Sequence, residues 1–152
     1  MNVLVDTSVW SLAFRRSNEI EHPAALLLKD LVTDGRAALI GPIRQEILSG
    51  VRSQDQFVSL RNGLRAFPDI VLRSDDYEEA SRFYNLCRAN GIQGSNTDFL
   101  ICAVASERKM PILTTDKDLY HYARILPISI YEEFDRGMSS ANFVQCLDRR
   151  PL

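Results

Sequence analysis

Short apolar runs alternate along this chain with longer segments in which apolar residues recur at helical spacing. This alternation predicts βαβ units, whose strands lie parallel in one sheet that helices cover. The expected strands are residues 2–5, 37–40, 70–72, 112–114 and 125–130. The expected helices start near residue 7 and span about 23–34, 43–48, 54–66, 74–89, 98–106 and 118–123. The sequence therefore predicts an α/β domain with a mostly parallel sheet of about five strands.

The length of 152 residues suits one domain with one core. No internal repeat, low-complexity tract or long linker divides the chain. We expect residues 1–131 to fold as the domain, because they carry the alternating pattern. Residues 132–152 have poor periodicity and should form a tail, either a loosely docked helix or an interaction segment, that frays at its end.

The composition is that of a soluble globular protein, with 45% hydrophobic and 25% charged residues. The longest apolar runs are far shorter than a membrane span. The first residues lack the basic and then apolar order of a signal peptide, so we expect a cytoplasmic protein with no membrane partner. The net charge of -2 neither supports nor excludes binding to nucleic acid.

The cysteines and histidines restrict the kind of metal site that this chain can build. Cys87, Cys102 and Cys146 are odd in number and widely spaced, which argues against a disulfide framework and a thiolate metal site. His22 and His121 are too few for a histidine-based zinc centre. Any metal should therefore be a hard cation that oxygen atoms bind.

Four acidic residues stand where apolar segments meet loops. Asp6 and Asp116 follow the first and fourth expected strands, Asp98 opens an apolar helix, and Glu46 lies within a short helix. Ligands of open parallel sheets bind at the carboxyl ends of the strands, where Asp6 and Asp116 should lie. A carboxylate beside apolar sequence is costly to bury unless a cation or hydrogen-bond donors compensate it. Together the acids would suit one or two Mg²⁺ or Mn²⁺ ions.

Each of these acids also has a separate explanation. Asp6, Asp98 and Asp116 could each cap a helix N-terminus, where a carboxylate accepts backbone N–H bonds, and Thr97 is an alternative cap beside Asp98. Glu46 could be a surface glutamate. The conjunction of all four favours a shared site over four unrelated contacts.

The segments around these acids resemble one known family. They are Val-Leu-Val-Asp6-Thr-Ser-Val-Trp, Pro-Ile-Arg-Gln-Glu46-Ile-Leu-Ser-Gly50, Asn96-Thr-Asp98-Phe-Leu-Ile-Cys-Ala-Val-Ala and Ile-Leu-Thr-Thr115-Asp116-Lys-Asp118-Leu. In this order and at this spacing, they resemble the PIN-domain ribonucleases, specifically the VapC-type toxins of toxin–antitoxin pairs. The resemblance spans residues 1 to about 130. It implies a PIN-like α/β/α sandwich and metal-dependent hydrolysis of RNA phosphodiesters.

The resemblance also assigns roles to the acids. It implies that Asp6, Glu46 and Asp98 are the core catalytic ligands of Mg²⁺ or Mn²⁺, and that Asp116 completes the quartet. Asp118 is a less certain ligand, because an aromatic residue usually follows this position and the chain has Leu119. The number of ions stays open.

Residues beside the acids are candidates for supporting contacts. Those that could hydrogen-bond the acids or their waters, unless they cap helices, are Thr7, Ser8, Asn96 and Thr115. Arginines near the first two motifs could contact RNA phosphates, with solvated surface as the alternative: Arg15, Arg16, Arg44 and Arg52.

The expected partners follow from the same resemblance, which implies an RNA substrate, a homodimer and a small antitoxin whose C-terminal segment lies in a groove leading to the site. Residues that could line this groove, or else belong to the core, are Trp10, Leu12, Phe14 and Phe57. The sequence does not specify which RNA is cut.

Two kinds of alternative function remain open. One is a PIN-fold module that binds RNA or protein without cutting. The other is a metal-dependent phosphohydrolase of another class. A haloacid dehalogenase phosphatase needs a second aspartate two residues after the first, where this chain has Ser8. A receiver domain needs a suitably placed lysine, and Lys109 and Lys117 fit poorly.

Overall fold

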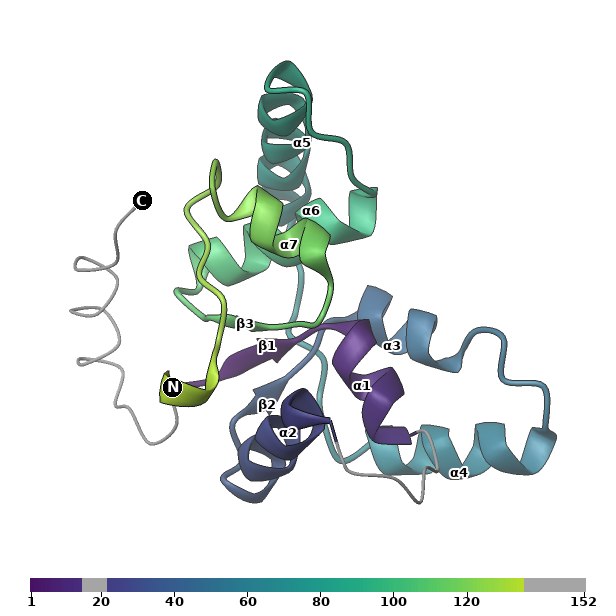
Figure 1. Ribbon diagram of the computed structural model, residues 1–152. Coiled ribbons are helices and arrows are strands. Elements are labelled where there is room, and N and C mark those ends of the chain that lie inside the picture. The colour runs from purple at the N-terminus through teal and green to yellow at the C-terminus, as the bar shows by residue number, and fades with distance from the viewer. Residues whose placement is uncertain (15–21, 136–152) are drawn as a thin grey trace.

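The computed structural model of the chain describes residues 1–14 and 22–135. Its elements follow in the order β1 (Val3–Val5), α1 (Thr7–Phe14), α2 (Pro23–Thr33), β2 (Ala37–Ala38), α3 (Gly41–Leu48), α4 (Gln54–Leu64), α5 (Ser74–Ala89), α6 (Asn96–Glu107), β3 (Ile112–Leu113), α7 (Lys117–Tyr122) and the 3-10 turn η1 (Glu133–Asp135). Helices α6 and α7 lie on one side of the strands, and α1 and α2 lie on the other (Figure 1). The predicted α/β class, with helices around a parallel sheet, is therefore confirmed.

The sheet has the strand order β2-β1-β3, and both neighbouring pairs are parallel. Its central strand β1 is a continuous apolar run whose residues are all fully buried. Such a run is typical of a parallel strand that is covered on both faces. Leu4 sets the register on both sides, because it pairs with Ala38 of β2 and with Ile112 of β3.

Two of the expected strands are wrong, so the sheet has three strands among the described residues rather than about five. In place of residues 70–72, only Asp69 forms a parallel bridge, to Leu39. Val71 beyond it is 78% exposed, so the segment gains no apolar burial by extending the ladder. In place of residues 125–130, a single bridge joins Ile130 to Ile112. Proline interrupts this second segment at position 127 and cannot donate to a ladder.

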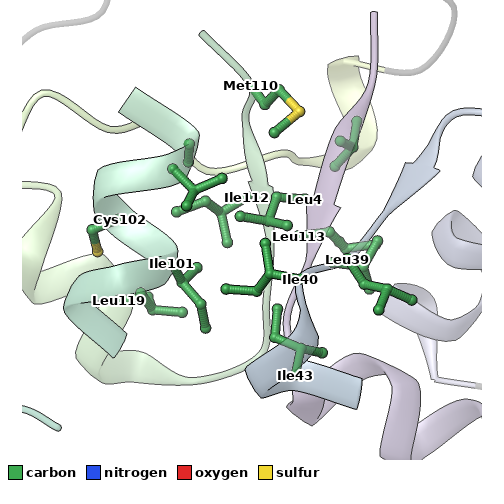
Figure 2. Close-up of a cluster of buried hydrophobic side chains, with 14 of the residues drawn as sticks. Leu4, Leu39, Ile40, Ile43, Ile101, Cys102, Met110, Ile112, Leu113 and Leu119 are labelled. Carbon is green, nitrogen blue, oxygen red and sulfur yellow. The ribbon is translucent and has the colours of Figure 1, made fainter. Parts of the chain in front are cut away.

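One part of the core lies between the sheet and α6, as Figure 2 shows for Leu4, Ile101 and Ile112, and buried residues of α1 and α2 extend the same cluster. Seven consecutive residues of α6, from Phe99 to Ala105, are buried. This confirms the expectation of a helix that is apolar on nearly every face. Cys102 belongs to this run and is a free, buried thiol.

A partly buried ion pair joins the start of α5 to the residue that follows α6. Arg108 donates from Nη1 to Oδ1 of Asp76 at 2.6 Å and from Nη2 to Oδ2 at 3.0 Å. Oδ2 also accepts the backbone N–H of Arg73 at 2.8 Å. These bonds lower the pKa of the Asp76 carboxyl, with the Arg108 hydrogen bond as the largest cause. The pair thus fixes α6, which carries Asp98, against α5.

Of the expected tail, residues 132–152, the structure describes only the first four residues, which end at Asp135, a buried residue of η1 whose carboxylate accepts the Glu132 N–H at 2.8 Å. The rest of the expected tail, residues 136–152, lies outside the described residues. No helix in the described part of the chain has both the length and the apolar composition that crossing a membrane requires.

Candidate metal centre

Asp6 lies at the carboxyl end of β1. Its backbone N–H donates to the Leu113 carbonyl at 2.9 Å, which continues the pairing of β1 with β3. Its side chain is only 6% exposed, and Oδ2 accepts hydrogen bonds from the hydroxyls of Ser8 at 2.7 Å and Thr114 at 3.0 Å. The two hydroxyls hold a buried carboxylate in one orientation without neutralising its charge.

The same hydroxyls tie the two strand ends together. Ser8 Oγ accepts the backbone N–H of Thr115 at 3.1 Å, and Thr114 Oγ1 accepts the backbone N–H of Asp116 at 3.0 Å. The expected contact of Ser8 with an acid is therefore present. Thr115 takes part through its backbone, and the hydroxyl that reaches Asp6 belongs to Thr114, which the sequence analysis did not select.

Asp116 follows β3 and caps α7, since its Oδ1 accepts the backbone N–H of Asp118 at 2.9 Å. The prediction that Asp116 caps a helix is thus correct. The cap uses only Oδ1 of the carboxylate, so it is compatible with a site at the same sheet edge. Asp118 itself is exposed in the first turn of α7.

Asp98 lies in the first turn of α6. The helix cap is Ser95, whose hydroxyl accepts the Asp98 N–H at 3.1 Å, so the expectation that Thr97 or Asp98 caps this helix is wrong. Burial raises the pKa of the Asp98 carboxyl, and the charge of Asp116 acts in the same direction. The Tyr122 hydroxyl, which donates to Asp98 Oδ2 at 3.1 Å, opposes this rise, as does Ser95. Asp98 is therefore a partly buried carboxylate that Tyr122 contacts from α7.

Glu46 lies on α3, as predicted, and joins the site through Thr7. The Thr7 hydroxyl donates to Glu46 Oε2 at 2.6 Å, and Thr7 follows Asp6 directly in the chain. The starts of α1 and α7 and helix α3 meet beyond the carboxyl end of the strands (Figure 1). The fold thus brings the predicted acids to one edge of the sheet.

These acids fit a hard cation by the chemistry of their donor atoms, which are carboxylate oxygens flanked by hydroxyls. The ion pairs that join described residues involve other acids, namely Asp69, Asp76 and Glu79. Within residues 1–14 and 22–135, no three His, Cys, Asp or Glu side chains converge as a preformed metal site would.

Asn96 and the arginines have different outcomes. Asn96 is exposed at the first position of α6, and no described hydrogen bond joins it to an acid. Arg15 and Arg16 lie outside the described residues. Arg52 is exposed between α3 and α4, so its phosphate contact stays a prediction.

Arg44 has a structural role instead of the expected phosphate contact. Its Nε donates to Asp69 Oδ1 at 2.9 Å, and its Nη1 donates to the Leu64 carbonyl at 2.9 Å. Its Nη2 donates to the Phe67 carbonyl. These bonds hold α3 against the end of α4 and use all three guanidinium nitrogens, so we do not propose Arg44 as a phosphate contact.

The aromatic residues of the first helix are divided between core and surface. Trp10 is buried, packs edge-on against Phe67 at 5.2 Å between ring centroids, and donates from Nε1 to the Val5 carbonyl at 3.2 Å. Phe14 stacks on Trp10 at 6.1 Å and is exposed. Trp10 therefore belongs to the core, and Leu12 and Phe57 are half-buried.

A parallel sheet that collects carboxylates at the carboxyl ends of its strands is the arrangement predicted from the motifs. The chain belongs to the PIN domain family, whose model matches residues 3–125. It is similar to the VapC ribonuclease Mb1587 of Mycobacterium bovis and to the ribonuclease VapC11 of Mycobacterium tuberculosis. Each is 32% identical over 127 residues, which cover 81% of this chain and 92% of the relative. The predicted resemblance to VapC-type PIN proteins is thus confirmed.

The fold is also similar to a solved structure, the crystal structure of FitAcB from Neisseria gonorrhoeae. The TM-score is 0.69 at 14% sequence identity, and the alignment covers 87% of this chain and 98% of the other. At this identity the likeness concerns the fold alone.

Proposed function

We propose that this chain is a metal-dependent endoribonuclease that acts as the toxin of a toxin–antitoxin pair. The observation that supports this best is the gathering of Asp6, Glu46, Asp98 and Asp116 at one sheet edge, where none forms an ion pair with a described residue. Relatives that are named ribonucleases support the choice of RNA as substrate. An RNA substrate in turn favours the cytoplasm as the site of action.

In this proposal Asp6, Asp98 and Asp116 hold the ion through their carboxylate oxygens, and Glu46 joins them from α3. Asp118 is a fifth candidate, placed at the exposed side of the site. A bound Mg²⁺ or Mn²⁺ supplies positive charge that makes water a better nucleophile and neutralises the phosphodiester in its transition state.

The neighbouring residues keep these oxygens in place. Ser8 and Thr114 fix the orientation of Asp6 from two sides, and Thr7 fixes that of Glu46. Such contacts reduce the reorganisation that a carboxylate undergoes when it binds an ion. Arg52, exposed just beyond α3, is the remaining described arginine that we propose as a phosphate contact.

We propose the partners that the family resemblance implies. These are RNA, a small antitoxin that covers the site, and a second copy of the chain. Co-expression with the reading frames that flank its gene, followed by size-exclusion chromatography with light scattering, tests the last two. Recovery of the chain as a monomer without any co-purifying small protein would contradict both.

Replacement of Asp6 by asparagine tests the proposed activity, because it preserves shape and removes the charge. The parent should cleave single-stranded RNA in Mg²⁺ or Mn²⁺ and stop in EDTA, and the variant should lose activity by on the order of 10²-fold or more. Asp55→Asn, an exposed acid in the first turn of α4, is the matched control and should cleave like the parent. A parent that binds RNA without cutting it would favour the non-catalytic module.

A further inference from the structure

Tyr122 connects two elements of the proposed site. It is fully buried near the end of α7, yet its hydroxyl lies 3.1 Å from Asp98 Oδ2 on α6 and 3.3 Å from the Gln93 carbonyl. Its ring packs against Phe99, with 4.9 Å between the centroids. The phenol is therefore held by packing and directs its hydroxyl at a carboxylate of the site.

Gly94 makes this position of Tyr122 possible. A Cβ atom at residue 94 would lie 2.2 Å from the Tyr122 hydroxyl oxygen, 2.8 Å from Cζ of the same ring and 2.9 Å from Cε2 of Phe99. The backbone of Gly94 is outside the positive-φ region, unlike that of Gly91. The need for glycine at this position thus comes from the close approach of the Tyr122 ring and not from the backbone conformation.

The Asp98 carboxylate is partly buried in the first turn of α6, so the direction of its oxygens depends on the donors around it. Ser95 accepts the Asp98 N–H at the start of the same helix, and Tyr122 donates to the carboxylate from α7. Since Asp116 caps the same helix α7, the Tyr122 hydrogen bond also fixes the distance between the elements that carry the two acids.

We propose that Tyr122, seated over Gly94, is a positioning residue that orients the Asp98 carboxylate for binding the divalent cation. This inference rests on the proposed metal-dependent function. The alternative is a purely structural tyrosine, whose hydroxyl the Gln93 carbonyl alone would satisfy. The two differ in whether the loss of the hydroxyl changes affinity for the ion.

The test compares Tyr122→Phe with Tyr84→Phe in the full chain. Both changes remove one phenolic hydroxyl beside Phe99, because Tyr84 packs against the same ring at 5.5 Å between centroids. Calorimetric titration with Mn²⁺ in the absence of RNA should give a Kd about 10-fold weaker for Tyr122→Phe or more, and an unchanged Kd for Tyr84→Phe. The melting temperatures of the metal-free variants should both stay within a few degrees of the parent.

Gly94→Ala provides a second, independent disturbance of the same contact. The added methyl should displace the Tyr122 ring and weaken Mn²⁺ binding by a similar factor. Tyr122→Phe removes the hydroxyl oxygen that would lie 2.2 Å from the added methyl. Adding Gly94→Ala to Tyr122→Phe should therefore weaken Mn²⁺ binding by a smaller factor than adding Gly94→Ala to the parent.

The outcomes separate this inference from the proposed function. If the parent binds Mn²⁺ and cleaves RNA, while Tyr122→Phe and Gly94→Ala both keep the parental Kd within twofold, Tyr122 is structural and the inference is overturned alone. If the parent neither binds Mn²⁺ nor cleaves RNA, the proposed function fails and this inference fails with it. Weaker Mn²⁺ binding in Tyr122→Phe than in Tyr84→Phe supports the positioning role.

Discussion

Replacement of Asp76 by asparagine should destabilise the protein by about 3 kcal/mol at pH 7, because it breaks the ion pair that holds α6 against α5. Breaking a buried pair typically costs about 3–5 kcal/mol. Asp76 is 4% exposed, whereas the Arg108 side chain is 26% exposed and can regain some water, which favours the lower end of that range. For a chain of this size, the loss corresponds to a melting temperature about 6–12 °C lower.

The same interaction predicts a pH dependence. Arg108 lowers the pKa of Asp76 in the folded protein below its unfolded value of about 3.9. A lowered carboxyl pKa gives stability that is complete above the unfolded pKa and is lost as the pH falls through the folded pKa. The difference in the free energy of unfolding between the parent and Asp76→Asn should therefore be largest at pH 7 and should become smaller below about pH 4.

Urea unfolding followed by circular dichroism measures both effects. The matched control is Glu79→Gln, which breaks an ion pair with Arg82 on the surface of the same helix, with side chains 35% and 63% exposed. An exposed pair contributes little, so this variant should unfold close to the parent. The reasoning is refuted if Asp76→Asn shifts the midpoint no more than Glu79→Gln, or if its deficit at pH 7 persists undiminished at pH 3.

Two further predictions concern the acids of the site. Asp98→Asn should stabilise the metal-free protein at pH 7. Burial and the charge of Asp116 raise the pKa of Asp98 in the folded protein, so the parent loses stability as the pH rises from the unfolded to the folded pKa of this carboxyl, and the asparagine removes that loss. In urea unfolding this gain should vanish at pH 3, and a variant less stable than the parent at pH 7 would contradict it. Thr114→Val should cost about 1–3 kcal/mol and slow RNA cleavage, because the Asp116 N–H loses its acceptor and Asp6 loses a donor. Thr115→Val is the control, because Thr115 contributes its backbone N–H. A Thr114→Val variant with the same melting temperature and the same RNA cleavage rate as Thr115→Val would argue against the prediction.

The sequence predicted the local elements wherever one periodicity dominates a long window. The helix from Ser74 to Ala89 and the buried run from Phe99 to Ala105 both follow their apolar patterns. The short strand before Asp6 was recognisable because a wholly apolar run ends abruptly in an acid. The strands expected at 70–72 and 125–130 were wrong because a strand depends on partners that are distant in sequence.

Part of the site was predictable for a similar reason. Asp6 and Asp116 mark the ends of recognisable strands, so their common edge follows from parallel topology. Thr114 was missed in favour of Thr115, although side chains alternate along an extended chain and the residue two positions before Asp116 should therefore face the same side as Asp116. The hydrogen bonds of Arg44 could not be predicted, because its acceptors follow or end another helix.

The sequence by itself therefore determined the α/β class and the parallel sheet, and it predicted the acids of the proposed site, since apolar periodicity and the position of a charge after a strand are local properties of the chain. Only the tertiary structure decided which donors hold each acid. The contact of Tyr122 with Asp98 over Gly94 joins three segments that no local pattern relates. It depends on how closely α7 packs against α6 and the loop before it, and such packing is fixed by the folded chain as a whole.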